Sequence, residues 1–296
     1  MRAKTAVLRL GGMGEVVLAG RITAALAPVV FVTRRAWLTL AAALPGVVEV
    51  RAAEDGLDLR DCGAVVDLQG SLRARWLLAR AGGGPRRGLA RADLRRRARV
   101  WFKLPPPAPL PARFAAAAGV PAAPAPWLTA PGPPAPPAAW GLVPGAAWAT
   151  KRWPPEAWAA LITQLPGTLR LFGGPEDGAL LSMLAEAAPA RVEIIVEAGF
   201  ERTLPGLAAC GVVIGGDTGL SHLARALGRP TLTLLGPTTA EDGLWADHAH
   251  TLGVDLPCRP CSRFGGPRCP VGDHACLRAL EPGQVAAAAA ALRAQP

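Results

Sequence analysis

Apolar and polar positions follow one another along the chain in blocks that predict strands and helices in alternation. Short apolar runs of strand length are each followed by a longer stretch with helical spacing. The first half contains three such pairs, at residues 5–10 and 15–26, 29–33 and 35–44, and 64–68 and 72–81. Because helices that link parallel strands give this alternation, the pattern predicts βαβ units in a doubly wound sheet.

The alternation resumes in the second half of the chain. Strands are expected at residues 140–144, 168–172, 192–196, 212–215 and 231–235, and helices at 155–165, 176–187, 204–209, 219–227 and 282–293. The last helix begins with proline in its first turn and is nearly all alanine, so we interpret it as a packing helix. Two similar α/β halves predict a cleft where the carboxyl ends of both sheets face each other.

A proline-rich segment separates the halves. Of the 33 residues at 105–137, 13 are proline, which is too many for a sheet interior or a long helix. One short helix is expected at residues 112–118, and the rest should run extended over the surface. We therefore predict an N-terminal domain at 1–138, including this linker, and a C-terminal domain at 139–296.

Composition and charge narrow the classes of partner. The chain is 51% hydrophobic and 18% charged, and its net charge of +10 favours an anionic partner such as a phosphorylated sugar, acidic lipid or nucleic acid. Arg9 and Glu15 interrupt the first apolar run, so we expect no secretory signal, and no uncharged run has the length of a membrane span. Seven arginines within residues 86–99 form either a solvated surface or an anion-binding loop, and both interpretations stay open.

A glycine loop follows the first predicted strand. Gly12 and Gly14 let the backbone turn tightly and approach a ligand just before a helix, and Glu15 lies in that helix's first turn. The loop lacks the dinucleotide fingerprint, because the next glycine after Gly14 is Gly20, six positions later, and no acidic residue ends the second strand. A nicotinamide enzyme is therefore disfavoured. Glu15 either stabilises the helix dipole or carries chemistry.

A second glycine loop, residues 215–222, opens the helix at 219–227. Asp217 or Thr218 is expected to cap this helix, while Gly219 leaves backbone N–H groups free to bind a diphosphate. His222 lies in the first turn, within reach of such a ligand. The alternative is an ordinary capped helix in which the histidine has no role. In either case one face of this helix is expected to be an apolar stripe and the opposite face polar; the stripe consists of Leu220, Leu223, Ala224 and Leu227.

Two further strand-to-helix loops carry charged side chains at the same predicted sheet edge. Lys151 ends the loop 144–154 and is placed to neutralise phosphate, although a Lys-Arg pair before a helix is also common in solvated loops. Glu176 follows a glycine pair, where its carboxylate either binds ribose hydroxyls or caps the next helix.

Taken together, these segments resemble a known family. "LRLGGMGEVVLAGRITAAL", "VVDLQGSLRARWLLAR", "LVPGAAWATKRWPPEAWAALI", "LFGGPED" and "VVIGGDTGLSHLARALGRPTLTLLGPT" are similar, in this order and over nearly the whole chain, to glycosyltransferase family 9, the heptosyltransferases. The resemblance implies a GT-B fold of two Rossmann-like parallel-sheet domains. It also implies inverting, metal-independent transfer of heptose from ADP-heptose to the lipid A-Kdo region or inner core of lipopolysaccharide, with no cofactor required.

The resemblance also assigns residue roles. The family's catalytic base is commonly Asp, and that position here is Glu15, one methylene longer. A carboxylate at a helix N-terminus can accept the acceptor hydroxyl's proton, while Lys151 and the N–H groups near Thr218 stabilise the departing diphosphate. The residues that it assigns to the donor are Gly12, Gly14, Lys151, Glu176, Asp217, Thr218, Gly219 and His222.

The acceptor bears phosphates and acidic sugars, so Gln69 and Arg73 are the acceptor-side candidates. The same resemblance implies work in the cytoplasm, with peripheral contact at the inner face of the membrane. We expect a monomer and no nucleic-acid partner.

The cysteines leave three interpretations open. Cys258, Cys261, Cys269 and Cys276 have the spacing of a small metal knuckle, with His274 as a substitute ligand, while two other cysteines stand apart. A structural zinc, free thiols and disulfides are all retained as hypotheses; a reducing compartment favours the first two.

Other functions stay open as alternatives. The chain's positive charge, arginine cluster and cysteine spacing are also typical of a nucleic-acid-binding protein, although the glycine loops would then be unexplained. A member of the same family that uses another nucleotide sugar, or that is catalytically silent, is equally compatible with Glu15 at the base position.

Overall fold

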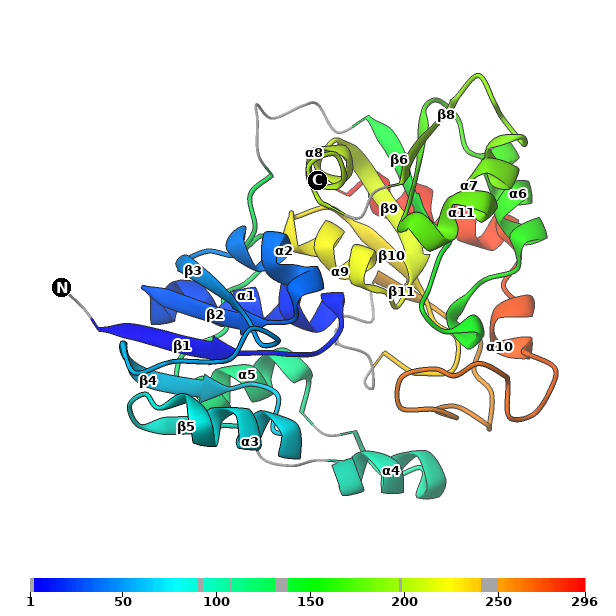
Figure 1. Cartoon of the computed structure of the whole chain (residues 1–296). Coiled ribbons are helices and arrows are strands. Elements are labelled where there is room, and N and C mark those ends of the chain that lie inside the picture. The colour runs from blue at the N-terminus through cyan, green and yellow to red at the C-terminus, as the bar shows by residue number, and fades with distance from the viewer. Residues whose placement is uncertain are drawn as a thin grey trace. The chain divides into compact units, whose positions relative to one another are not determined.

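The computed structural model describes residues 3–89, 93–106, 108–130, 138–196, 199–240 and 250–295. The chain divides into two compact units, each with its own sheet (Figure 1). The N-terminal unit comprises Met1–Leu94 and Pro107–Leu128, and the C-terminal unit comprises Arg95–Pro106 and Thr129–Pro296. The cleft expected between the halves stays a prediction.

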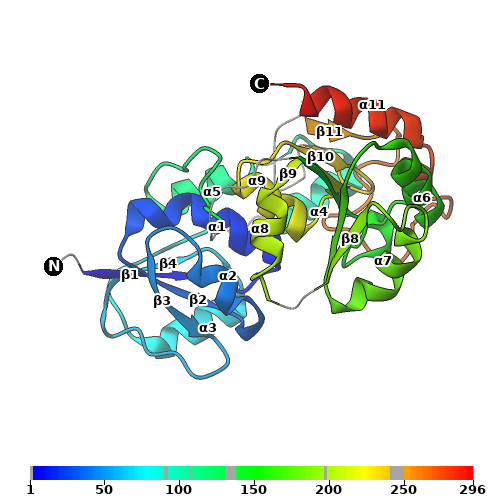
Figure 2. The same ribbon diagram turned by 90° about the horizontal axis from the view of Figure 1, so that it is seen from above.

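The N-terminal unit is built on a five-stranded parallel sheet of order β3-β2-β1-β4-β5. Its strands are β1 (Lys4–Leu8), β2 (Val29–Thr33), β3 (Val47–Ala52), β4 (Cys62–Asp67) and β5 (Arg86–Gly88). Its helices are α1 (Met13–Leu26), η1 (Arg35–Trp37), α2 (Leu38–Ala42), α3 (Leu72–Ala81) and α5 (Leu110–Ala118). Figure 2 shows α1 and α5 on one face of the sheet and α3 on the other, which buries every residue of β2. β-branched side chains on both faces suit such a covered parallel strand.

The proline-rich segment is more ordered than its composition predicts. The expected helix is present and begins at Leu110, and α5 packs against α1. Beyond it, Trp127 is buried and its indole Nε1 donates a hydrogen bond to the Val17 carbonyl at 3.0 Å. The expectation that this stretch runs over the surface is therefore wrong at Trp127 and Leu128, because their apolar area gains more from covering α1 than from facing water.

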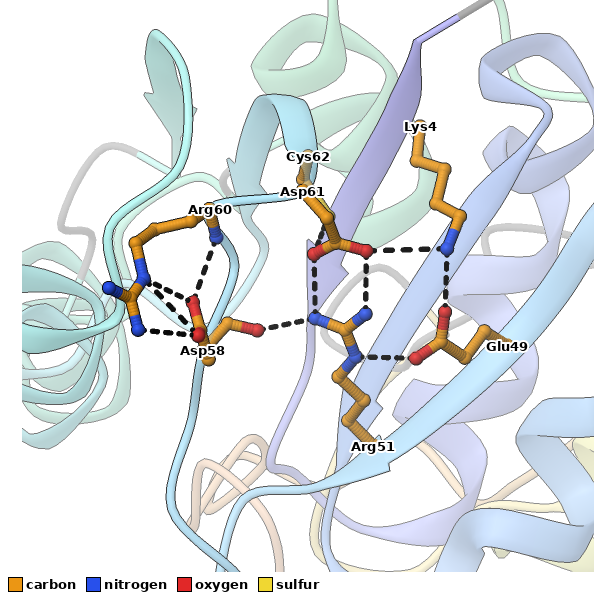
Figure 3. Close-up of polar contacts among 7 residues, drawn as sticks. All are labelled: Lys4, Glu49, Arg51, Asp58, Arg60, Asp61 and Cys62. Carbon is orange, nitrogen blue, oxygen red and sulfur yellow. Dashed lines mark hydrogen bonds and ion pairs between the residues drawn. The ribbon is translucent and has the colours of Figure 1, made fainter.

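A charged network joins side chains of β1 and β3 to the residue that precedes β4. Lys4 begins β1 and contacts both Glu49 (2.9 Å) and Asp61 (3.3 Å), while Arg51 contacts the same two carboxylates at 2.7 and 2.8 Å (Figure 3). Lys4 and Asp61 lie at the amino ends of β1 and β4. Since catalytic loops of parallel sheets lie at the carboxyl ends of strands, we interpret this network as stabilising rather than chemical.

The C-terminal unit is built on a six-stranded parallel sheet of order β11-β10-β9-β6-β7-β8. Its strands are β6 (Ala139–Val143), β7 (Leu169–Gly173), β8 (Val192–Val196), β9 (Cys210–Gly216), β10 (Thr231–Leu234) and β11 (Thr251–Leu252). Its helices are η2 (Ala149–Lys151), α6 (Pro155–Gln164), η3 (Pro175–Asp177), α7 (Gly178–Ala185), α8 (Thr203–Ala208), α9 (Gly219–Ala226), α10 (Ala275–Arg278) and α11 (Pro282–Arg293). The prediction of two Rossmann-like parallel-sheet halves is confirmed.

Helices cover both faces of this second sheet. Figure 2 shows α6 and α7 on one face and α8 and α9 on the other. The terminal helix α11 has the predicted bounds and packs on α6 and β9, burying Val285, Ala289 and Leu292. Its interpretation as a packing helix is confirmed.

The arginine-rich stretch is divided between two elements. Arg86 and Arg87 lie on the short strand β5, and Arg95, Arg96, Arg97 and Arg99 fall in helix α4 (Asp93–Phe102), whose residues from Arg95 onward belong to the C-terminal unit. Arg91 lies outside the described residues. The described part of the stretch is therefore a strand and a helix rather than one loop.

Candidate active site

The candidate residues of the N-terminal unit lie where its strand order reverses. β1 is followed in the chain by strands on one side of it, and β4 lies on its other side, so the loops after β1 and β4 diverge at this switch point. Ligands of open parallel sheets bind at the carboxyl ends of strands at such points. Here the Leu10 N–H donates to Gln69 Oε1 at 3.0 Å, which ties the two loops together.

Glu15 is the third residue of α1 and its carboxylate is held by charge and by backbone. Oε1 pairs with Arg9 Nη2 at 2.5 Å, and Oε2 accepts a hydrogen bond from the Gly12 N–H at 3.2 Å. The side chain curls back over Gly11, where any β-carbon would overlap the carboxylate. It stays 19% exposed, so the carboxylate is oriented without being sealed from solvent.

Arg9 is a functional candidate that the sequence pattern did not reveal. Its side chain is 7% exposed, donates to the Leu68 carbonyl and stacks 5.4 Å above the Phe114 ring. A buried arginine needs a paired anion and satisfied hydrogen bonds. The available signal was a cation directly after an apolar strand that leads into a glycine loop.

The remaining N-terminal candidates surround this pair. Gly12 caps α1 from an extended conformation with open space beside its α-carbon, and Gly14 is buried in the first turn. Gln69 accepts the Leu10 bond, whereas Arg73 is exposed in the first turn of α3.

In the C-terminal unit, the switch point lies between β6 and β9. Strands β7 and β8 extend the sheet on the β6 side, and β10 and β11 extend it on the β9 side. Lys151 ends η2 after β6, and its ammonium contacts the Asp217 carboxylate at 2.6 Å and the Asp217 carbonyl at 3.1 Å. Two loops that the sequence singled out separately thus meet through one ion pair.

Asp217 acts as a hub between two candidate side chains. Its other carboxylate oxygen lies 3.1 Å from His222 Nε2. Burial would raise the pKa of Asp217, but the nearby Lys151 and His222 outweigh that effect and hold the pKa well below its usual range. The carboxylate is therefore ionised and orients Lys151 and His222.

The start of α9 leaves its backbone available to a ligand. Thr218 is the N-cap, but its side chain makes no capping hydrogen bond, and the Thr218 hydroxyl instead lies 3.2 Å from Ser221 Oγ. The expectation of a side-chain cap is therefore wrong. Uncapped N–H groups in a first turn are the donors that bind an anion.

The face of α9 predicted to be polar is also buried. Ser221, His222 and Arg225 are 1%, 3% and 5% exposed, whereas Leu220 from the predicted stripe is only partly buried. Covering both sides of α9 forces these polar groups into contacts: Ser221 Oγ donates to the Gly216 carbonyl at 2.8 Å.

The loop after β7 contributes two carboxylates with different roles. Glu176 is exposed at the strand's carboxyl end. Asp177 is buried, accepts the Gly174 N–H at 3.1 Å and fills the space beside Gly145; burial raises its pKa. Asp177 therefore connects the loops after β6 and β7, and Glu176 is the group left for a ligand.

All six cysteines are free, and among the residues that the structure describes no group of three or more His, Cys, Asp or Glu side chains is arranged to hold a metal ion. The Cys258, Cys261, Cys269 and Cys276 thiols lie near enough for Cys261 and Cys276 to have pKa values raised by burial and by the other thiolates. The structure gives the zinc and disulfide hypotheses no support. None of the described helices has the length and apolar character to cross a bilayer.

Comparison with known proteins finds a sequence family that is similar to most of the C-terminal unit. The profile described as glycosyltransferase family 9 (heptosyltransferase) matches residues 129–267. Lipopolysaccharide heptosyltransferase 1 of Pseudomonas aeruginosa is 37% identical over 132 residues, 38% of this chain and 33% of that protein. The protein of the same name from Escherichia coli K12 is 39% identical over 92 residues, 30% and 28% of the two chains.

These alignments span about a third of the length of the curated relatives. Solved structures extend the likeness of fold over the whole chain. E. coli ADP-heptose lps heptosyltransferase II has a TM-score of 0.71 at 18% identity, covering 98% of both chains, and E. coli heptosyltransferase WaaC with ADP has 0.65 at 20%, covering 97% of this chain and 99% of that one.

Proposed function

We propose that this chain is a member of glycosyltransferase family 9, whose profile matches residues 129–267, and that it transfers a heptosyl group from ADP-heptose to the inner core of lipopolysaccharide. Relatives named as lipopolysaccharide heptosyltransferases support this activity, and a family member solved with ADP supports the nucleotide. The observation that carries the proposal is the Lys151–Asp217 pair beside the uncapped start of α9 at the C-terminal switch point.

Donor binding is assigned to this switch point. Lys151, held at 13% exposure by Asp217, neutralises part of the diphosphate charge. The first-turn N–H groups of α9, around Thr218 and Gly219, supply further donors, and His222 lies on the other side of Asp217. Exposed Glu176 is assigned to the ribose hydroxyls. Preorganised positive groups of this kind stabilise charge on a leaving group.

Transfer is proposed to be a single displacement with inversion. The acceptor hydroxyl oxygen bonds to the anomeric carbon as the bond from that carbon to the ADP oxygen breaks. Glu15 accepts the hydroxyl proton, and ADP leaves with the electron pair of the broken bond. Arg9 and the Gly12 N–H hold the Glu15 carboxylate in one orientation, which offsets the freedom that its extra methylene adds relative to Asp. We propose that no metal ion takes part, since Lys151 and the α9 terminus supply the positive charge.

A substrate panel tests the activity. The protein is incubated with ADP-heptose, ADP-glucose and UDP-glucose, each with a lipid A-Kdo acceptor and with a truncated core acceptor, in the presence and absence of EDTA. A mass gain of one heptose with release of ADP, unchanged by EDTA, is the expected result. Transfer only from another nucleotide sugar, or no transfer from any, would contradict the proposed donor.

The acceptor side and the membrane are assigned to other surfaces. Gln69, at the N-terminal switch point, and exposed Arg73 are proposed to contact the anionic core sugars. Because that acceptor is anchored in lipid, we propose that the protein works as a monomer in the cytoplasm, in peripheral contact with the inner membrane.

Helix α4 is the surface proposed for that contact. On an ordinary surface helix the charged side chains face solvent and the aromatic ones are buried, whereas here a charged side chain is buried and two aromatic ones are exposed. Arg99 is buried and donates to Thr239 Oγ1 at 3.3 Å, and Lys103, just past the helix, donates to the Cys258 and Pro260 carbonyls at 2.8 Å. Trp101 and Phe102 are instead 79% and 73% exposed. Exposed aromatics in an arginine-rich helix suit the headgroup region of an anionic bilayer.

A further inference from the structure

Thr150, the residue before Lys151, has its backbone and side-chain polar groups hydrogen-bonded to a segment of the same unit that is distant in sequence. Thr150 is 5% exposed. Its hydroxyl donates to the Gly266 carbonyl at 3.0 Å and accepts from the Gly266 N–H at 2.8 Å, and its own N–H donates to the same carbonyl at 3.2 Å. Three hydrogen bonds thus join one threonine to one glycine 116 positions away.

A fourth bond comes from a strained histidine. His274 Nε2 donates to the Thr150 carbonyl at 2.9 Å. The His274 backbone has φ of 55°, a left-handed conformation that residues other than glycine rarely adopt. Such strain persists only where surrounding contacts fix it, and it concentrates near functional sites. The four bonds therefore satisfy the N–H, carbonyl and hydroxyl groups of Thr150 from the cysteine-bearing segment 258–276.

Close packing also limits the movement of residues 148–150 at two further points. Gly265, with φ of 96°, approaches Trp148 so closely that a β-carbon would lie 2.9 Å from the Trp148 β-carbon. At Gly236, which follows β10, a β-carbon would lie 2.7 Å from the Thr150 carbonyl oxygen. Residues 148–150 have little room to move, and Lys151 extends from the end of this fixed piece.

We infer that Thr150 is a positioning residue for Lys151, and that segment 262–274 acts as a brace that sets where the Lys151 ammonium meets the donor diphosphate. The inference rests on the proposed function of Lys151. A lysine has a long, flexible side chain, so its placement depends on a rigid backbone origin as well as on its partner Asp217. The brace supplies that origin, and it explains why a threonine is buried at a loop position next to the switch point.

The test measures ADP affinity by calorimetry on the full chain. Thr150→Val removes the hydroxyl but keeps the side chain's shape, so ADP binding should weaken about tenfold, whereas Thr150→Ser keeps both hydroxyl bonds and should bind as wild type. Thr163→Val is the matched control, because the exposed Thr163 hydroxyl donates to the Ala160 carbonyl within α6. It should change ADP affinity less than twofold.

A double-mutant cycle separates positioning from general structure. If Thr150 acts through Lys151, Thr150→Val should have no further effect on ADP affinity in a Lys151→Ala background. Equal losses in both backgrounds would overturn the inference, as would wild-type affinity in Thr150→Val. Should Thr150→Val fail to fold, His274→Ala takes its place in the same cycle with the same outcomes.

The cycle also distinguishes this inference from the proposed function. An unchanged ADP affinity in Lys151→Ala alone would contradict the donor-site assignment itself. A loss in Lys151→Ala without a loss in Thr150→Val would leave the donor site standing and reject the brace.

Discussion

At the scale of single residues, the ion pair with Arg9 orients the Glu15 carboxylate that is proposed to act as the base. Glu15→Gln keeps the shape of the side chain but cannot accept a proton, so transfer should fall about 10²- to 10⁴-fold with ADP affinity unchanged. Initial rates and calorimetry measure the two effects. Glu156→Gln, in the first turn of α6, controls for loss of a helix-start carboxylate and should keep full activity. Full turnover in Glu15→Gln would remove Glu15 from the mechanism.

Thiol reactivity is also decided residue by residue. Burial raises the pKa of Cys62 and Cys276 to about 11 and that of Cys210 to about 12, so at pH 8 these three are almost entirely protonated and shielded. Iodoacetamide at pH 8 should therefore label the partly exposed Cys258 and Cys269 first. Peptide mass spectrometry over a time course measures the order. Early labelling of Cys62 or Cys210 would contradict the buried positions.

At the scale of elements, helix α4 carries the proposed membrane contact. Replacing Trp101 and Phe102 together by alanine should reduce binding to vesicles containing phosphatidylglycerol about tenfold, since both rings lose their apolar contact with the bilayer. Co-sedimentation with these vesicles, and with neutral phosphatidylcholine vesicles, measures it. Trp76→Ala on α3, an exposed tryptophan of the N-terminal unit, is the control.

Transfer to an acceptor that lacks the lipid should be the same in the α4 double variant and in wild type, since α4 is assigned to the membrane and not to catalysis. Unchanged vesicle binding by the double variant, or binding that is equal for neutral and anionic vesicles, would contradict the membrane assignment. Retention of the protein by random DNA in the same salt range would favour nucleic acid instead.

At the scale of the whole molecule, the network of Lys4, Glu49, Arg51 and Asp61 should govern acid stability (Figure 3). Hydrogen bonds from Arg51 and Lys4 lower the pKa of both carboxylates. Their contribution to the free energy of unfolding is therefore full above their ordinary pKa values of about 4 and is lost as the pH falls through the lower folded values. Asp61→Asn should reduce the free energy of unfolding by about 1 kcal/mol at pH 7.

Urea unfolding at pH 7 and pH 3 measures this effect. The difference between wild type and Asp61→Asn should shrink at the lower pH, because the unfolded chain of the wild type then binds a proton that the folded network excludes. Asp55→Asn is the control, since Asp55 pairs with Arg35 outside the network. A difference that stays constant with pH would show that Asp61 acts through something other than its charge.

The sequence by itself determined the elements and the loops that matter. Alternating apolar runs and helical spacing are local properties, and they placed β2, β8, α3 and α11 at their observed bounds. The edge strand β3 was missed because it carries charges such as Glu49 and Arg51, which suit a solvated edge but break the apolar pattern. The glycine loops also identified Glu15, Lys151 and Asp217 one at a time.

Only the tertiary structure decided which of these residues are partners. Strand order places β6 beside β9, which pairs Lys151 with Asp217, and it places β1 beside β4, which brings Arg9 into hydrogen-bond contact with the Leu68 carbonyl. Contacts such as Thr150 with Gly266 join positions more than a hundred residues apart. Hydrophobic periodicity indicates which side of an element is covered but carries no information on which element covers it. The neighbouring strand order is what buries Asp217 between Lys151 and His222.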